Sequence, residues 1–305
     1  MKLDILAFGA HPDDVEMGCG GTIAKSTSNG KKVGIVDLTR GELGTNGNVE
    51  IREEEANVAS KILGVSFRMN LELEDGFIFN NKESQIKIVE VIRHYKPDIV
   101  LSNTQIDRHS DHGKASDLIY DACFISGLSK LKTSFEGSNQ DPWRPRINLN
   151  YQQWNDFDPD VLIDVTNYME AKIESILSYN SQVIKNHTSK STKINSEDFI
   201  DSISYRSKNY GRLIDVEYAE AFQSRRNIGI NDISDLSEYF AYADIYTTGP
   251  FGIYVYIDKE NPSEHITYLS QSGLGLPNRG YYFDEDAKSK NIRKEYVIHI
   301  EKIFR

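Results

Sequence analysis

Short apolar runs alternate with amphipathic stretches over about the first 236 residues of the chain. Five of the apolar runs predict buried strands: Lys2–Phe8, Lys32–Leu38, Phe67–Leu73, Asp98–Ser102 and Val161–Val165. Six amphipathic segments predict helices: Thr22–Ser28, Val49–Leu63, Ser84–Tyr95, Gly113–Ser126, Asn167–Tyr179 and Phe199–Leu213. Strands that alternate with helices form βαβ units, so this pattern predicts an α/β fold: a Rossmann-like, mostly parallel sheet with helices on both faces.

Two stretches depart from this alternation. Residues 130–155 are aromatic, polar and proline-containing, which predicts a long irregular segment. Near residue 236 the character of the chain changes, and tyrosine and phenylalanine crowd together beyond that point. We therefore expect one domain over residues 1–236 and a short C-terminal appendage over residues 237–305.

The composition is that of an ordinary folded domain, with 39% hydrophobic and 27% charged residues. A formal net charge of −11 opposes general attraction to nucleic acid or to anionic membranes. The two cysteines, Cys19 and Cys123, are too few for a disulfide framework. No apolar run approaches the roughly 18 residues of a membrane span. We expect a cytoplasmic protein without nucleic-acid or membrane partners.

Candidate metal ligands follow the first predicted strand. His11, Asp13 and Asp14 come directly after Gly9, and the carboxyl ends of strands are where open α/β sheets bind ligands. One imidazole and two carboxylates suit zinc or another divalent ion, but one loop cannot close a site alone. A second cluster follows the strand at Asp98–Ser102: Asp107-Arg108-His109-Ser110-Asp111-His112. Together the two loops predict an open three-ligand site.

The two motifs, Ala10-His11-Pro12-Asp13-Asp14 and His109-Ser110-Asp111-His112, resemble those of the PIG-L-type zinc deacetylases. These enzymes remove an acetyl group from N-acetylglucosaminyl conjugates. The resemblance covers about residues 1–236 and continues in four further segments: Thr39–Glu42, Arg52–Ala56, Ser181-Gln182 and Tyr218–Phe222. It is strongest to the bacillithiol-biosynthesis branch, whose substrate is N-acetylglucosaminyl malate. The resemblance implies a Zn²⁺ cofactor, a small-molecule N-acetylglucosaminyl conjugate as partner, and a homo-oligomer.

The resemblance also implies roles for the site residues. His11, Asp14 and His112 match the metal positions, which leaves Asp13 beside the metal as general base. Zinc with three protein ligands and one open position lowers the pKa of its bound water to about 7, and this water is the expected nucleophile. An alternative interpretation is that Asp13 or Asp14 only caps the segment that follows.

His109 is the expected acid or oxyanion stabiliser, with Asp111 orienting a histidine. An adjacent carboxylate would favour the imidazolium form that both tasks require. The alternative is that His109 and His112 are surface loop residues.

Two further residues are candidates for binding the substrate. Arg52 is expected to bind the malate carboxylate through its fork-shaped donor group. The alternative for Arg52 is an ion pair with Glu55, three positions further along a helix. Tyr210 is a candidate for polarising the acetyl carbonyl, although the spacing alone does not determine this role.

The C-terminal appendage resembles a different family. The stretch Tyr268–Phe283 contains Gln-Ser-Gly-Leu-Gly-Leu-Pro followed by Tyr281-Tyr282, as in an internal segment of neprilysin-like metallopeptidases. A zinc peptidase of that type needs His-Glu-x-x-His on a helix, and the chain contains no such motif. The appendage is therefore expected to be a peptidase fragment without its zinc motif. Two alternatives to the malate-conjugate deacetylase stay open: a deacetylase of another N-acetylglucosamine conjugate, and a metal-binding but inactive chimera.

Overall fold

The computed structural model describes residues 1–185, 187, 189–228, 251–257, 265–271 and 286–303. The chain divides into two compact units, Met1–Ile228 and Gly229–Arg305. The expected boundary at residues 236 and 237 lies outside the described residues.

The first unit is built on a seven-stranded sheet of order β3-β2-β1-β4-β7-β9-β8. Its strands are β1 (Ile5–Gly9), β2 (Val33–Thr39), β3 (Phe67–Leu73), β4 (Ile99–Ser102), β7 (Ile147–Tyr151), β8 (Val161–Asp164) and β9 (Ala219–Gln223). The pairings from β3 through β7 are parallel, whereas β9 is antiparallel to both β7 and β8. The predicted mostly parallel α/β sheet is confirmed.

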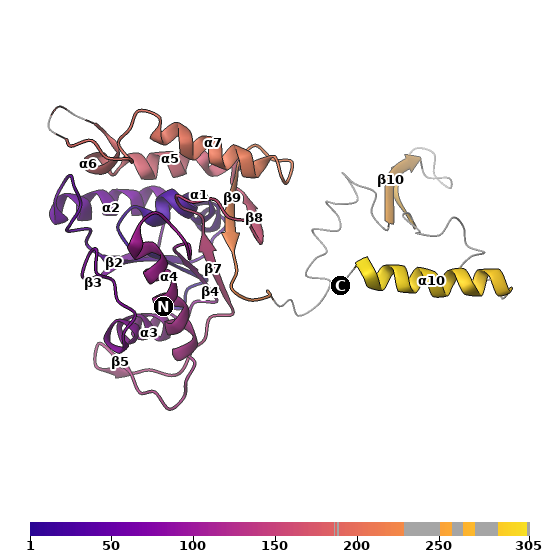
Figure 1. The fold of residues 1–305 in the computed structure, drawn as a ribbon, viewed down its shortest axis with the longest axis horizontal. Coiled ribbons are helices and arrows are strands. Elements are labelled where there is room, and N and C mark those ends of the chain that lie inside the picture. Colours follow the sequence, from indigo (N-terminus) through magenta and orange to yellow (C-terminus); the bar gives the residue numbers. More distant parts are fainter. Residues whose placement is uncertain (186, 188, 229–250, 258–264, 272–285, 304–305) are drawn as a thin grey trace. The chain divides into compact units, whose positions relative to one another are not determined.

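Helices cover both faces of this sheet (Figure 1). They are α1 (Asp14–Ser28), α2 (Val49–Leu63), α3 (Lys82–Tyr95), α4 (Ser110–Ile125), the 3₁₀ turn η1 (Thr166–Tyr168), α5 (Met169–Leu177), α6 (Asn180–Val183) and α7 (Phe199–Gly211). Alternate side chains of β1 point to opposite faces: Leu6 and Phe8 pack in the core beneath α3 and α4, while Ile5 and Ala7 pack beneath α1. Figure 1 shows α5 and α7 as a further layer outside α1 and α2.

The first helix begins earlier than its sequence pattern indicates. The expected start was Thr22, after a glycine-rich turn, but α1 begins at Asp14 and is interrupted at Cys19, which has a non-helical backbone (φ −142°, ψ 23°). The glycines serve close packing instead of a turn. A Cβ atom at Gly18 would lie 2.2 Å from the Tyr151 ring, and one at Gly21 would lie 2.9 Å from the side chain of Val165.

The expectation of an irregular segment over residues 130–155 is wrong in part, because this segment contains the sheet strand β7. It also contains the short strands β5 (Ser134–Phe135) and β6 (Ser138–Asn139). Strand β7 was not predicted because its asparagines, Asn148 and Asn150, interrupt the apolar pattern. Asn150 is buried, and its side-chain Nδ2 donates hydrogen bonds to Ser102 Oγ, the Asn103 carbonyl and Ser116 Oγ. Internal hydrogen bonds therefore offset the cost of burying a polar strand.

Strand β9 carries Glu220 into the interior beside the break in α1. Its carboxylate accepts hydrogen bonds from the backbone N–H groups of Gly21 and Thr22 at 3.0 and 2.7 Å, so it caps the second part of α1. The same carboxylate pairs with the buried Lys172 Nζ of α5 at 2.5 Å. The Tyr218–Phe222 segment thus returns to the sheet.

Replacing Glu220 by alanine is expected to lower the free energy of unfolding by about 3–5 kcal/mol, because it leaves Lys172 as an uncompensated buried charge. Chemical denaturation of the purified chain measures this loss. The matched control is Glu174→Ala, an exposed position on the same helix as Lys172, which should change stability by about 0.5 kcal/mol or less. Equal losses in the two variants would contradict the role of the Lys172–Glu220 pair.

In the second unit, β10 (Phe251–Ile257) pairs with β11 (His265–Gln271) in an antiparallel ladder, and Tyr254 lies opposite Tyr268. The helix α10 spans Ala287–Ile303. The glycine- and proline-containing stretch that carries the peptidase resemblance, residues 272–283, lies outside the described residues. Among the helices of the described part, none combines the length and the apolarity needed to cross a lipid bilayer.

Candidate metal centre

A cavity of about 300 Å³ lies where the strands of the parallel sheet end. Residues that follow five strands line it: His11, Asp13 and Asp14 after β1, Leu43–Thr45 after β2, Asp75-Gly76 after β3, Asp107–His109 and His112 after β4, and Gln153-Trp154 after β7. Arg52 of α2 and Arg206 of α7 complete the charged part of the lining. The two predicted metal loops therefore meet at one sheet edge, as the strand order requires.

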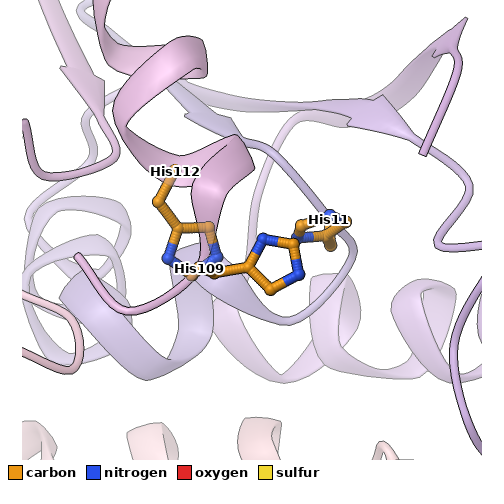
Figure 2. Close-up of side chains that lie close together, drawn as sticks. All are labelled: His11, His109 and His112. Atoms are coloured by element: carbon orange, nitrogen blue, oxygen red, sulfur yellow. The ribbon is translucent and has the colours of Figure 1, made fainter. Parts of the chain in front are cut away.

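The three predicted ligands come together around Asp14. One carboxylate oxygen, Oδ1, lies 3.1 Å from His112 Nε2, and the other, Oδ2, lies 3.6 Å from His11 Nδ1. Both spacings are close to the roughly 3.3–3.6 Å that separates ligand atoms placed tetrahedrally at about 2.0–2.2 Å from zinc, and they involve different oxygens of Asp14. His11, His109 and His112 also offer nitrogens within 4.8 Å of one another, and Figure 2 shows their rings grouped together.

The other nitrogen of His11, Nε2, is buried without a hydrogen-bond partner and faces a different pair of carboxylates. His11 Nε2 lies 3.0 Å from Asp75 Oδ1 and 3.5 Å from Asp111 Oδ2, but it makes no hydrogen bond of acceptable geometry. His11, Asp75 and Asp111 thus form a second donor group that shares His11 with the first. A group of imidazole and carboxylate donors this close together suits zinc or another divalent ion.

Neighbouring side chains hold the predicted ligands in place. His112 Nδ1 lies 2.5 Å from Asp107 Oδ2, a carboxylate–histidine contact of the kind that orients metal ligands. Asp14 accepts hydrogen bonds from Asn103 Nδ2 at 3.0 Å and from Gln153 Nε2 at 2.8 Å. The structure therefore places Asp107 next to His112, whereas Asp111 accepts a hydrogen bond from the backbone N–H of Gly76 and lies beside His11.

Sequence reasoning assigned no role to Asp75, Asp107, Asn103 or Gln153. Asp107 belongs to the second candidate cluster but had no role of its own, and Asp75 follows the end of β3, so the rule that located His11 could have found it. Gln153 could not be found in this way because strand β7, which positions it, was not predicted.

The electrostatics around the two ligand histidines favour a cation. Burial lowers the pKa of His112, but the carboxylates of Asp14 and Asp107 outweigh it and raise the pKa to about 9. For His11 burial again lowers the pKa, and contacts with Asp111, Asp14 and Asp75 outweigh it and raise the pKa well above its usual value. The negative charge of nearby carboxylates thus outweighs the effect of burial at both imidazoles, and the same negative charge would attract a divalent cation.

Asp13 lies beside the ligands in a strained backbone conformation. Its φ of 116° is in the left-handed region that favours glycine, and its side chain makes no capping hydrogen bond to α1. The alternative that Asp13 serves only as a cap is therefore wrong. Its carboxylate lies 3.2 Å from Arg52 Nη2, which also donates to the Pro12 carbonyl at 2.5 Å.

Arg52 lines the cavity, and its role in substrate binding stays a prediction. Its guanidinium already makes hydrogen bonds within the protein. Besides Asp13 and Pro12 it donates to the Gly41 carbonyl at 3.2 Å. The alternative ion pair with Glu55 is wrong, since Glu55 accepts hydrogen bonds from the backbone N–H and the hydroxyl of Ser181.

His109 lies in the cavity, where its ring centroid is 4.7 Å from that of His11. It is the N-cap residue of α4, and its Nδ1 accepts a hydrogen bond from the Asp111 backbone N–H at 3.3 Å. The expected imidazolium is wrong: burial, followed by the neighbouring His11 and His112, lowers the pKa of His109. Since Nδ1 accepts the hydrogen bond from Asp111, the proton of a neutral ring would lie on Nε2. Neither His109 nor His112 is an exposed loop residue.

The prediction that Tyr210 faces the substrate is not supported. Tyr210 is absent from the described residues that line the cavity, and its hydroxyl donates to the Phe157 carbonyl at 3.5 Å. It packs instead in a small core with Ala219 and Ala221. Arg206, about one helical turn earlier, is the α7 residue that lines the cavity.

Comparisons with known proteins agree with this fold. The family model for GlcNAc-PI de-N-acetylase (PIG-L) matches residues 6–123. Diacetylchitobiose deacetylase from Thermococcus kodakarensis is 31% identical over 188 residues, which cover 58% of this chain and 69% of that protein. The crystal structure of the conserved protein TT1542 from Thermus thermophilus is 33% identical, with a TM-score of 0.67 over 75% of this chain and 97% of that one. The chain belongs to the PIG-L family.

Two other similarities bear on function. The 4-oxalmesaconate hydratase of Pseudomonas putida is 25% identical over 184 residues, which cover 56% of this chain and 70% of that protein. The family model for peptidase family M13 matches residues 171–305. This second match begins within α5, so it overlaps the first unit as well as the C-terminal appendage.

Proposed function

We propose that this chain is a zinc-dependent N-deacetylase that removes the acetyl group from N-acetylglucosaminyl malate in bacillithiol biosynthesis. The observation that carries the proposal is the grouping of His11, Asp14 and His112 as metal donors around a cavity, with the Asp13 carboxylate beside them. Membership of a family whose relatives include a named deacetylase supports the reaction type.

The chain supplies a group for each proton transfer of amide hydrolysis. A bound zinc ion would polarise the acetyl carbonyl and lower the pKa of water near it. Asp13, buried beside Arg52, accepts the proton of the attacking water as general base. His109, whose Nδ1 accepts a hydrogen bond from a backbone N–H, presents Nε2–H as a hydrogen-bond donor to the carbonyl oxygen, and the proton taken up by Asp13 passes to the leaving amine.

The anionic malate group is the finer part of the proposal. Arg108 and Arg206 line the cavity, and they place positive charge at the site of a chain whose net charge is −11. Arginine suits carboxylates because its planar fork can donate two parallel hydrogen bonds. Arg52 adds charge from the floor of the cavity, although its guanidinium already serves Asp13.

Amine release from N-acetylglucosaminyl malate by the full chain tests the proposal, with N-acetylglucosamine as the comparison substrate and a metal chelator as control. Chelator-sensitive release that favours the malate conjugate is the expected result. Equal release from both substrates would reject the malate specificity and leave a deacetylase of other N-acetylglucosamine conjugates. A folded, zinc-loaded chain that releases no amine from either would reject the deacetylase and favour the inactive chimera.

A hydratase is the second candidate, because the chain is similar to 4-oxalmesaconate hydratase over most of that protein's length. Water addition to a conjugated carbon–carbon double bond needs the same polarised carboxylate or carbonyl and the same base. Loss of the ultraviolet absorbance of an unsaturated dicarboxylate, without amine release from any acetylated sugar, would favour this activity over deacetylation.

A further inference from the structure

Trp154 occupies an unusual position at the mouth of the cavity. It lines the cavity, yet the residue is 43% exposed, which is high for so large an aromatic side chain. The Arg108 guanidinium lies 4.8 Å from the centre of its ring and lines the same cavity. Trp154 therefore presents aromatic surface next to the predicted metal donors, and apart from the Arg108 contact this surface has no part in the proposed proton transfers.

The backbone that carries Trp154 is tied to the metal donors from two sides. Asp107 Oδ1 accepts hydrogen bonds from the backbone N–H groups of Trp154 and Asn155 at 3.1 and 3.0 Å, while Oδ2 of the same carboxylate contacts His112 Nδ1. On the other side, the preceding residue Gln153 donates to Asp14 Oδ1. These contacts join the segment that holds the indole to His112 on one side and to Asp14 on the other.

We propose that Trp154 is a specificity-determining residue whose indole stacks on the pyranose ring of the substrate, and that Asp107 and Gln153 couple its position to occupancy of the metal site. The inference rests on the proposed function and extends it to the sugar. A pyranose presents axial C–H groups on its faces, and the negative face of an aromatic ring attracts their positive hydrogens. The malate carboxylates would instead be bound by Arg108 and Arg206.

Tryptophan fluorescence tests the stacking directly, because the chain contains only two tryptophans. The other, Trp143, packs against the core and donates its Nε1–H to the Pro97 carbonyl, away from the cavity lining. The Trp143→Phe variant therefore reports on Trp154 alone. Methyl glucosaminide, which has no acetyl group to lose, is expected to shift its emission saturably, whereas Trp154→Phe should show no saturable shift. If Trp143→Phe fails to fold, the difference between wild type and Trp154→Phe gives the same signal.

Asp107→Asn tests the coupling. Asparagine keeps the shape, but its amide would donate to His112 Nδ1 and so place the ring proton on Nε2, the nitrogen that faces Asp14. Zn²⁺ added to chelator-treated Trp143→Phe protein is expected to shift Trp154 emission. Introducing Asp107→Asn should raise the zinc concentration needed by about 10–100-fold. An emission that is indifferent to zinc in both proteins would overturn the coupling.

Steady-state kinetics with N-acetylglucosaminyl malate completes the test. Trp154→Ala should raise KM about tenfold with kcat within about twofold, and Trp154→Phe should lie between alanine and wild type. The control is Tyr205→Ala, an aromatic residue on α7 that is exposed and does not line the metal cavity, with KM unchanged. An unchanged KM in Trp154→Ala together with emission indifferent to sugar would overturn the stacking. Emission that changes with sugar, without amine release, would support the stacking and reject the deacetylase. Amine release with an emission that does not change with sugar would support the deacetylase and reject the stacking.

Discussion

Replacing Asp14 by alanine is expected to remove bound zinc and to lower amine release by more than about 10³-fold, because the metal supplies both the nucleophile and the carbonyl polarisation. Asp14 is the carboxylate that joins the other two predicted ligands, with one oxygen toward His112 and the other toward His11. Without it, only two imidazoles remain of the three predicted ligands. Zinc content by mass spectrometry and amine release measure the two effects in one preparation.

The matched control for this variant is Asp201→Ala, an exposed position on α7 outside the metal cavity. It should retain full zinc and full turnover. An Asp14→Ala protein that keeps one zinc per chain would show that the second donor group, His11 with Asp75 and Asp111, holds the ion instead. Asp75→Ala would then become the variant that loses zinc.

Asp13→Asn is expected to lower kcat by about 10²–10⁴-fold while zinc content stays unchanged, because a general base is lost and the predicted ligands are kept. The side chain of Asp13 faces Arg52, and the hydrogen bonds that hold Asp14 come from other residues. Asparagine matches the shape of aspartate and retains an oxygen for Arg52, so the strained backbone should persist. Asp201→Asn is the control, and loss of zinc in Asp13→Asn would count against a purely catalytic role.

The pH profile should identify the same residue. Burial raises the pKa of Asp13 to about 7, and the nearby Arg52 opposes this only in part. A general base acts in its ionised form, so kcat should rise with pH through this pKa and level off above it. A bound divalent cation favours the ionised carboxylate, which places the acid limb of the zinc-loaded enzyme below pH 7. This limb should disappear in Asp13→Asn.

The positions of the main elements and of the metal donors follow from local sequence. Apolar runs predicted β1 to β4 and amphipathic periodicity predicted α2 with its observed bounds, Val49–Leu63, because both signals are local. His11, Asp14 and His112 could be expected to meet because their loops leave parallel strands at the same edge of one sheet. This geometry depends on strand direction and order and not on the detail of side-chain packing.

Only the tertiary structure decided which partner each polar side chain has. Asn150 made β7 look like a loop, since a buried amide is favourable only where Ser102, Asn103 and Ser116 accept its hydrogen bonds. Arg52 engages Asp13 and not Glu55, because the loop after β1 brings the carboxylate to α2. Hydrogen bonds and burial join residues far apart in the chain, so Asp107 and Gln153 acquired their contacts to the ligands only when the sheet was assembled.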